Sequence, residues 1–128
     1  MKLTNPLNLN LIDATGYTTG GNWDFYDQAH IDEIADSMRT NGWQGAPLVV
    51  LPDYSVSYSG THRLRAAEAA ELDEVPAVTL HDLFAACDLD LDAICDEHDL
   101  GFLSDRGEIV ARLPEDARIT YTLNDIED

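Results

Sequence analysis

The stretch of residues 58–67 constrains the fold most, because it changes from strand-like to helix-like within a few positions. Residues 56–58 alternate apolar and polar side chains, as a half-buried strand does. Gly60 interrupts this alternation where the backbone must turn sharply. Thr61 can cap the helix that Leu64 and the alanines after it favour. The sequence therefore predicts a strand, a tight turn and a helix N-terminus.

The start of this helix is a candidate anion site. The free N–H groups of a helix N-terminus, together with the helix dipole, favour a negative charge. Arg63 adds a guanidinium group whose geometry fits phosphate oxygens, and Thr61 and His62 add a hydroxyl and an imidazole beside it. We interpret the turn as a phosphate site. An ordinary capped helix with a surface arginine fits the same spacing and stays open as the alternative.

The charge of the chain restricts its partners. The 128 residues suffice for one domain, and they carry 25 acidic against 7 basic side chains, a net charge of −18. Because such a surface repels nucleic-acid backbones, we expect no direct nucleic-acid binding. Two explanations of the acidity remain: adaptation of a solvated surface to high salt, as in a halophile, or recognition of a basic protein partner, including mimicry of DNA phosphates.

The sequence predicts a cytoplasmic protein. No apolar run approaches the ~20 residues of a membrane helix, and the N-terminal residues lack the apolar core of a signal peptide. Cys87 and Cys95 are expected in a single helix, about 12 Å apart along its axis, which is too far for a mutual disulfide. Free thiols fit a reducing compartment.

The apolar periodicity predicts an α/β fold, with a small mixed sheet and packed helices over residues 1–82 and an acidic, mainly helical extension over residues 83–128 packed on the same domain. The expected strands are 7–13, 47–51, 55–59, 75–80 and 118–123. The expected helices are 27–41, 61–72 and a region over 83–95, and Ser104 is expected to cap a further segment before 109–111. Residues 14–22 are expected to form a loop, and 124–128 an acidic tail.

Three alternating aspartates, Asp88, Asp90 and Asp92, resemble the start of a calcium-binding loop. An EF-hand needs a glycine at its sixth position and a bidentate glutamate at its twelfth. Ala93 and Asp99 stand at those positions here. We therefore interpret the run as a solvated face and predict no metal site there.

Four segments between residues 23 and 80 resemble the ParB/sulfiredoxin superfamily, and they occur in the order found there. They are a helix ending in Asn-Gly at 31–42, a proline followed by a strand at 47–50, Gly-Thr-His-Arg-Leu-Arg-Ala-Ala at 60–67, and a connection containing Val-Pro-Ala-Val at 71–78. At the third segment ParB proteins carry Gly-Glu-Arg-Arg-x-Arg-Ala-Ala, and sulfiredoxins carry Gly-Cys-His-Arg.

The resemblance implies a site for the phosphates of ATP or CTP, with magnesium. Carried over by position, the nucleotide-binding residues are Ser59, Gly60, Thr61, His62, Arg63 and Arg65. Arg65 has an alternative role, since it lies within reach of an ion pair with Glu68 or Glu33.

Position 61 departs from both branches of the superfamily. Sulfiredoxins need a nucleophilic cysteine there, and the CTPase branch of ParB has a glutamate. Thr61 forms no thiolate and is a poor general base, so sulfinic-acid reduction is not expected. If hydrolysis or transfer occurs, Thr61 would help to hold the metal, and another carboxylate, from Asp24, Asp27 or Glu33, must act as the base. For each carboxylate, a solvated charge at a helix start stays the alternative.

The first hypothesis is thus a ParB-like nucleotide-binding domain with hydrolase or phosphotransferase activity. The alternative is a non-enzymatic accessory protein, encoded by a phage or mobile element, whose acidic surface binds a basic partner. A third hypothesis is a small-molecule kinase with Asp24 or Glu33 as the base. No basic helix-turn-helix follows the motif, so neither a chromosome-partitioning clamp nor a nuclease is expected. The sequence carries no signal for the oligomeric state.

Overall fold

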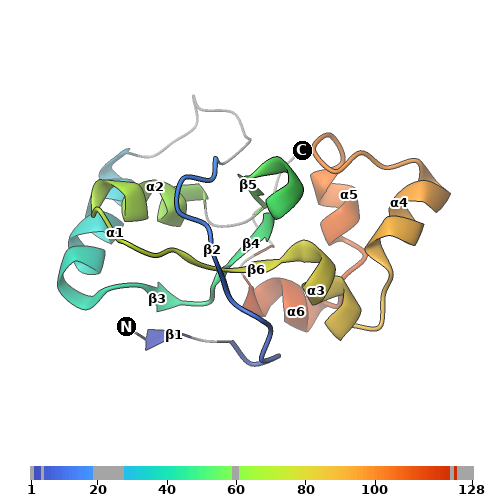
Figure 1. Ribbon diagram of the computed structural model, residues 1–128, viewed down its shortest axis with the longest axis horizontal. Helices are drawn as coiled ribbons and strands as arrows, with labels where there is room; N and C mark the ends of the chain where they lie inside the picture. The colour runs from blue at the N-terminus through green and yellow to red at the C-terminus, as the bar shows by residue number, and fades with distance from the viewer. Residues whose placement is uncertain (1, 4, 19–27, 59–60, 122, 124–128) are drawn as a thin grey trace.

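The computed structural model describes residues 2–3, 5–18, 28–58, 61–121 and 123 (Figure 1). Its strands are β1 (Lys2–Leu3), β2 (Ile12–Asp13), β3 (Gln44–Gly45), β4 (Leu48–Leu51), β5 (Val56–Ser57) and β6 (Pro76–Thr79). Its helices are α1 (Gln28–Asn41), the short 3-10 helix η2 (Pro52–Tyr54), α2 (Thr61–Ala69), α3 (Leu80–Ala86), α4 (Leu91–His98), α5 (Arg106–Val110) and α6 (Glu115–Thr120). In this part of the chain no helix is long and apolar enough to cross a membrane.

The main sheet has four strands in the order β2-β6-β4-β5. The central strands β4 and β6 are parallel, whereas β2 and β5 run antiparallel to their neighbours. Strands β1 and β3 form a separate parallel pair, and an isolated bridge joins Thr18 to Val56 at the β5 edge. The expected α/β fold with a small mixed sheet and packed helices is therefore confirmed.

Strand β4 has both faces covered by helices. All four of its residues are buried, and they alternate between two hydrophobic clusters. Leu48 and Val50 pack with the helices α1 and α2, whereas Val49 and Leu51 pack with α3, α4, α5 and α6. A continuous apolar run is the expected sequence of a strand buried on both faces. Figure 1 shows the two groups of helices on opposite sides of the sheet.

Helix α1 forms where its apolar periodicity predicts it. Ile31, Ala35 and Met38 are buried on one stripe, as residues three and four apart on a helix are. Gly42 ends the helix in the left-handed region (φ 73°), and its N–H donates to the carbonyl of Met38 over 2.8 Å. The buried stripe determines which side of α1 faces the core, and Gly42 determines where the helix ends.

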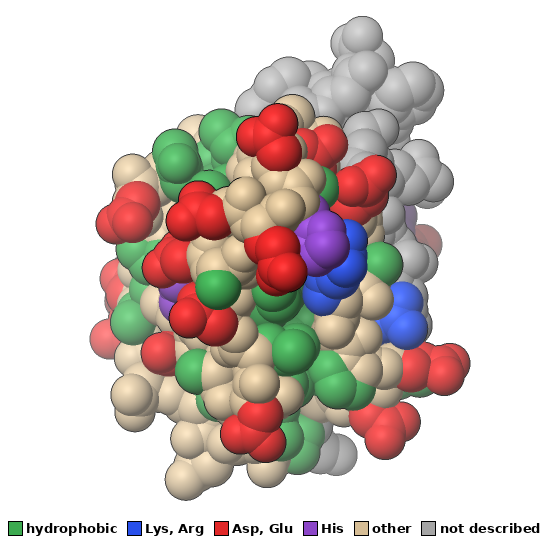
Figure 2. Space-filling model, turned by 90° about the vertical axis from the view of Figure 1, so that its right-hand side faces the viewer, with side chains coloured by type: hydrophobic (Ala, Val, Ile, Leu, Met, Phe, Trp, Pro, Cys, Tyr) green, Lys and Arg blue, Asp and Glu red, His purple; other side chains and the backbone are tan. Residues whose placement is uncertain are grey.

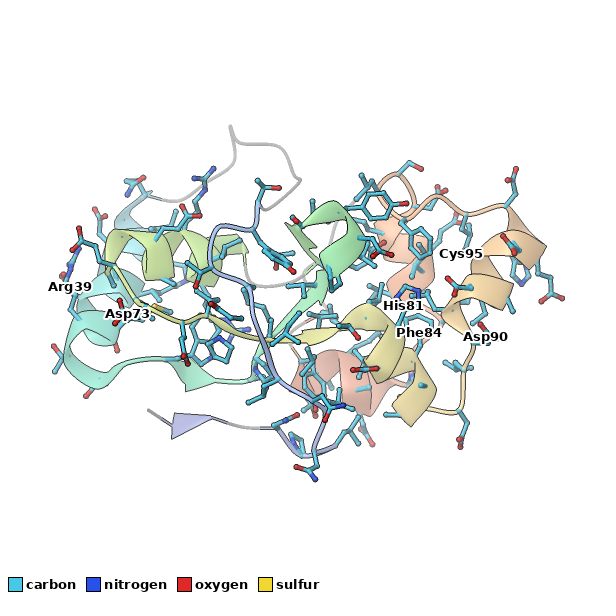
Figure 3. All side chains as sticks on the ribbon, viewed as in Figure 1. Arg39, Asp73, His81, Phe84, Asp90 and Cys95 are labelled. Carbon is cyan, nitrogen blue, oxygen red and sulfur yellow. The ribbon has the colours of Figure 1, made fainter. Side chains whose placement is uncertain are left out.

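The C-terminal helices supply the core on the other face of the sheet. Leu83 and Phe84 from α3, and Ile109 from α5, are fully buried in the same cluster as Val49 and Val78 of the sheet. Figure 3 shows Phe84 on α3 and Cys95 on α4 within this helical half of the molecule. A domain boundary at residue 82 stays a prediction, and the side chains on both sides of that position pack against the same strands.

The expected strand over 118–123 is wrong, because α6 occupies Glu115–Thr120. Leu113, Ala117 and Tyr121 are buried and spaced four residues apart, so burial follows the helical period. The Tyr121 hydroxyl also donates to the side-chain oxygen of Asn5 over 2.7 Å. Packing against the core thus decides this segment against its β-branched composition.

The expected single helix over 83–95 is also wrong. Helix α3 ends at Ala86, Asp88 adopts the left-handed region (φ 60°), and the carboxylate of Asp90 caps α4 by accepting from the N–H of Ala93 over 3.1 Å. Cys87 and Cys95 therefore belong to different elements. Both are free thiols, and burial raises the pKa of each.

Several smaller boundaries differ from expectation: α2 ends at Ala69 rather than at residue 72, and β5 and β6 are shorter than the strands expected over 55–59 and 75–80. Of the strand expected over 7–13, only Ile12–Asp13 forms, because the Asn5 side chain bonds both the N–H and the carbonyl of Leu9 and holds a turn there. Helix α5 begins after Asp105 rather than after a Ser104 cap, and Asp105 instead accepts from the N–H of Gly101 over 2.8 Å.

The carboxylate of Asp13 ties β2 to the start of β6. One oxygen accepts from the Thr15 hydroxyl (2.6 Å), the Val75 N–H (2.9 Å) and the Thr15 N–H (3.0 Å). These hydrogen bonds, with the Thr15 hydroxyl the strongest, lower the pKa of Asp13. The charged form is therefore the one that the fold stabilises.

We predict that Asp13→Asn destabilises the protein more at pH 7 than at pH 3. A carboxylate whose pKa is lower in the folded state contributes stability above its unfolded pKa of about 3.9, and that contribution is lost as the pH falls through the folded value. Urea unfolding of the wild type and the variant at both pH values measures the difference. Glu97→Gln, which removes an exposed carboxylate from α4, is the control. A deficit for Asp13→Asn that is equal at both pH values would contradict the assignment.

Candidate functional site

The start of α2 lies beside the connection between β3 and β4. Because β5 runs antiparallel to β4, the end of β5 is next to the beginning of β4, and the N–H of Tyr58 donates to the carbonyl of Val49 over 2.7 Å. Residues 59–60 come next, outside the described residues, and α2 then begins at Thr61. The pairing of two strands thus sets where this helix starts.

Arg63 is held against the β3–β4 connection. One terminal nitrogen, Nη1, donates to the carbonyl of Ala46, and the guanidinium carbon lies 4.9 Å from the centre of the Trp43 ring. The indole N–H of Trp43 donates to the same Ala46 carbonyl over 3.1 Å. A planar guanidinium stacked on an aromatic face has little freedom to rotate. The Arg63 side chain is therefore fixed in place before any ligand arrives.

Gly45 gives this connection its path. Its backbone adopts φ 88°, which side chains of L-amino acids rarely tolerate. A Cβ atom at this position would lie 3.7 Å from Nη1 of Arg63, an ordinary contact distance. The glycine is thus required by the backbone turn, and that turn brings the Ala46 carbonyl to Arg63.

The electrostatics at Arg63 favour a negative partner. Burial lowers the pKa of its guanidinium to about 10, so the group stays charged at neutral pH while it is partly removed from water. It also stands in the first turn of α2, where the helix dipole is positive and a cation is disfavoured. An anion at this point would offset both the cost of burying the guanidinium charge and its repulsion by the helix dipole.

Arg65 is engaged within its own helix. Its Nη1 lies 3.4 Å from a carboxylate oxygen of Glu68, one turn further along α2. Pairing with Glu68 was one of the two roles that its spacing allows. The observed contact supports the structural role, and a role of Arg65 toward phosphate stays a prediction.

The other predicted site residues are placed as follows. Thr61 and His62 are the first two residues of α2. Glu33 is exposed on α1, two residues after the buried Ile31 and so about 200° around the helix from it. Asp24, Asp27, Ser59 and Gly60 lie outside the described residues. The structure therefore brings Arg63 to the start of α2, and it puts Glu33 on the solvent side of α1.

Sequence reasoning missed the residues that hold Arg63. Trp43, Gly45 and Ala46 stand just before the buried strand β4, and their only local signal is a glycine after a tryptophan. Ala46 and Arg63 are 17 positions apart, so no helical or strand period connects them. Their association follows from the pairing of β4 with β5.

These features define a class of small α/β domain, in which a parallel strand pair lies under a helix whose first turn presents a fixed arginine. Residues 17–85 match the family model of the ParB N-terminal domain, which is more than half of the chain. The chain therefore belongs to the ParB N-terminal domain family. No curated protein and no solved structure matches it. The matched region contains α1, α2 and the candidate site, whereas α4, α5 and α6 lie beyond it.

Proposed function

We propose that this chain binds the phosphates of a nucleotide, ATP or CTP, at the first turn of α2. The observation that carries the proposal is the guanidinium of Arg63, which is partly buried, stacked on Trp43 and held at a helix N-terminus. Membership of the ParB N-terminal domain family supports it, because the resemblance of residues 60–67 to the ParB/sulfiredoxin motif implies a nucleotide phosphate site there.

Binding would use two kinds of donor. The backbone N–H groups at the start of α2 have no carbonyl partner within the helix, and they can donate to phosphate oxygens. The guanidinium of Arg63 would neutralise part of the phosphate charge, and a prearranged cation in a partly dry site acts more strongly than one in water. In a chain of net charge −18, an anion needs such a local positive site to approach at all.

Magnesium would come to this site with the nucleotide. In the described part of the chain no group of three His, Cys, Asp or Glu side chains is arranged to hold a metal ion. Magnesium in nucleotide sites is usually held by substrate phosphates with one or two carboxylates, so it would need few ligands from the chain itself. Asp24, Asp27 and Glu33 are the candidates for such a carboxylate. Bound there, the ion would neutralise charge on the terminal phosphate.

Hydrolysis or phosphoryl transfer extends the same proposal. Thr61 would help to orient the metal, and Asp24 or Glu33 would accept the proton of water or of an acceptor hydroxyl. Nucleotide consumption that requires an added acceptor would identify a small-molecule kinase. Consumption by the protein with nucleotide alone would identify a hydrolase.

We predict that Arg63→Met weakens nucleotide binding by at least about tenfold, since a hydrogen bond to a charged group contributes roughly 1.5–3 kcal/mol. Methionine keeps apolar packing against Trp43 while it removes the charge and the donors. Calorimetry of each of the four ribonucleoside triphosphates with magnesium measures the affinity. Circular dichroism checks that the variant is folded.

The matched control is Arg112→Met, which removes the same charge from an exposed position after α5. It should bind like the wild type. Equal affinity in all three proteins would remove Arg63 from the site, and no binding of any ribonucleotide to the wild type would overturn the proposed function.

A second candidate function is binding of a basic partner through the surface of α4. The carboxylates on and beside this helix are exposed: Asp88, Asp90, Asp92, Asp96, Glu97 and Asp99. Figure 2 shows Asp and Glu side chains spread over the face that carries α4, with few basic groups among them. This density of negative charge favours a partner rich in lysine or arginine.

We predict that neutralising Asp92, Asp96 and Glu97 to their amides weakens binding of a poly-lysine peptide if α4 is the partner surface. The matched control neutralises Asp53, Asp73 and Glu74, which are exposed elsewhere and give the same change in net charge. Fluorescence anisotropy at physiological salt compares the two variants. Equal weakening in both would show an effect of net charge alone and would contradict a site on α4.

A further inference from the structure

We propose that Arg106, from the C-terminal helix α5, is a positioning residue that holds the strand leading into the phosphate-binding turn. Its effect on nucleotide affinity rests on the function proposed above. The residue lies outside the region that matches the family, so the inference concerns what this chain adds to the ParB N-terminal domain.

Arg106 is a buried charge in contact with the end of β5. Its exposed fraction is 8 %, the guanidinium carbon lies 5.1 Å from the centre of the Tyr58 ring, and Nη1 is 3.4 Å from the carbonyl oxygen of Ser57. The two positions that it contacts are consecutive, and they immediately precede Ser59 in the sequence. The side chain therefore reaches the last described residues before the turn.

Tyr58 is also fixed from other directions. Its hydroxyl donates to the carbonyl of Phe102, its N–H donates to the carbonyl of Val49, and its side chain is almost fully buried. Phe102 and Arg106 both belong to the segment around α5. The C-terminal segment thus contacts the backbone of Ser57 and both the ring and the hydroxyl of Tyr58.

An arginine at this position indicates a role in fixing the position of the end of β5, beyond any contribution to stability. Burying a guanidinium costs free energy, and an apolar side chain would cover Tyr58 without that cost. Only a planar donor both stacks on the ring and donates to the Ser57 carbonyl. Arg106 therefore specifies where the end of β5 lies.

Described residues on either side of positions 59–60 are therefore both anchored. Arg63, just after these positions, is anchored on the sheet face that α1 and α2 cover, and Arg106 anchors the residues just before them from the opposite face. The first turn of α2 must present its backbone N–H groups to phosphate, so its position relative to the end of β5 matters for binding. Loss of Arg106 should loosen the end of β5, at Ser57 and Tyr58, while the rest of the fold stays intact.

The test compares Arg106→Met with Arg112→Met, which makes the same substitution at an exposed position nearby. Hydrogen–deuterium exchange without nucleotide is read at the amides of Ser57 and Tyr58, which donate to the carbonyls of Thr18 and Val49. We expect faster exchange there in Arg106→Met only, with residues 31–38 of α1 unchanged. ATP and CTP affinity with magnesium, measured where circular dichroism shows full folding, should fall about tenfold in Arg106→Met.

Arg106→Lys gives the second comparison, since lysine keeps the charge and loses the planar stacking donor. Amide exchange at Ser57 and Tyr58 should be faster in Arg106→Lys than in the wild type and slower than in Arg106→Met. Arg106→Lys also replaces Arg106→Met in the test if that variant does not fold. Exchange at Ser57 and Tyr58 that matches Arg112→Met would overturn the proposal, as would acceleration that is equal at α1. If the wild type binds no nucleotide, the proposed function fails, and the exchange comparison still decides the positioning role.

Discussion

The structure depends on the burial of β4 on both of its faces. Its side chains alternate between the cluster under α1 and α2 and the cluster under the C-terminal helices, so neither group of helices can be removed without exposing half of the strand. Each fully buried valine or leucine contributes roughly 1.5–3 kcal/mol. The region that matches the ParB N-terminal domain family therefore has its second face completed by residues beyond residue 85.

The same strand places the candidate site. The start of β4 lies beside the end of β5, so the Ala46 carbonyl reaches Arg63 and the first turn of α2 follows directly. The site is built from backbone conformation as much as from side chains: Gly45 in its positive-φ conformation, the Ala46 carbonyl that anchors Arg63, and the start of α2, where the first N–H groups of a helix have no acceptor within the helix. We propose anion binding more firmly than catalysis for this site, because Thr61 forms no thiolate and is a poor general base.

The sequence was informative where the signal is local. The apolar run of β4, the helical stripe of α1, and the strand and helix on either side of Gly60 were all predicted, since each rests on a short period or a glycine. Predictions failed where long-range packing overrides local preference, as in residues 118–123, whose β-branched composition gives way to the burial of Ala117 and Tyr121 on a helix. The contact of Arg106 with Ser57, 49 positions apart, has no local signal at all.

The central claim is that the first turn of α2, with Arg63 beside it, receives the phosphates of a nucleotide. The most direct measurement is a crystal structure of the chain soaked with ATP or CTP and magnesium. The account predicts phosphate density within hydrogen-bonding distance, roughly 2.7–3.2 Å, of the Arg63 guanidinium and of backbone N–H groups at the start of α2. Nucleotide density elsewhere on the molecule, with Arg63 still bound only to its own protein, would contradict it.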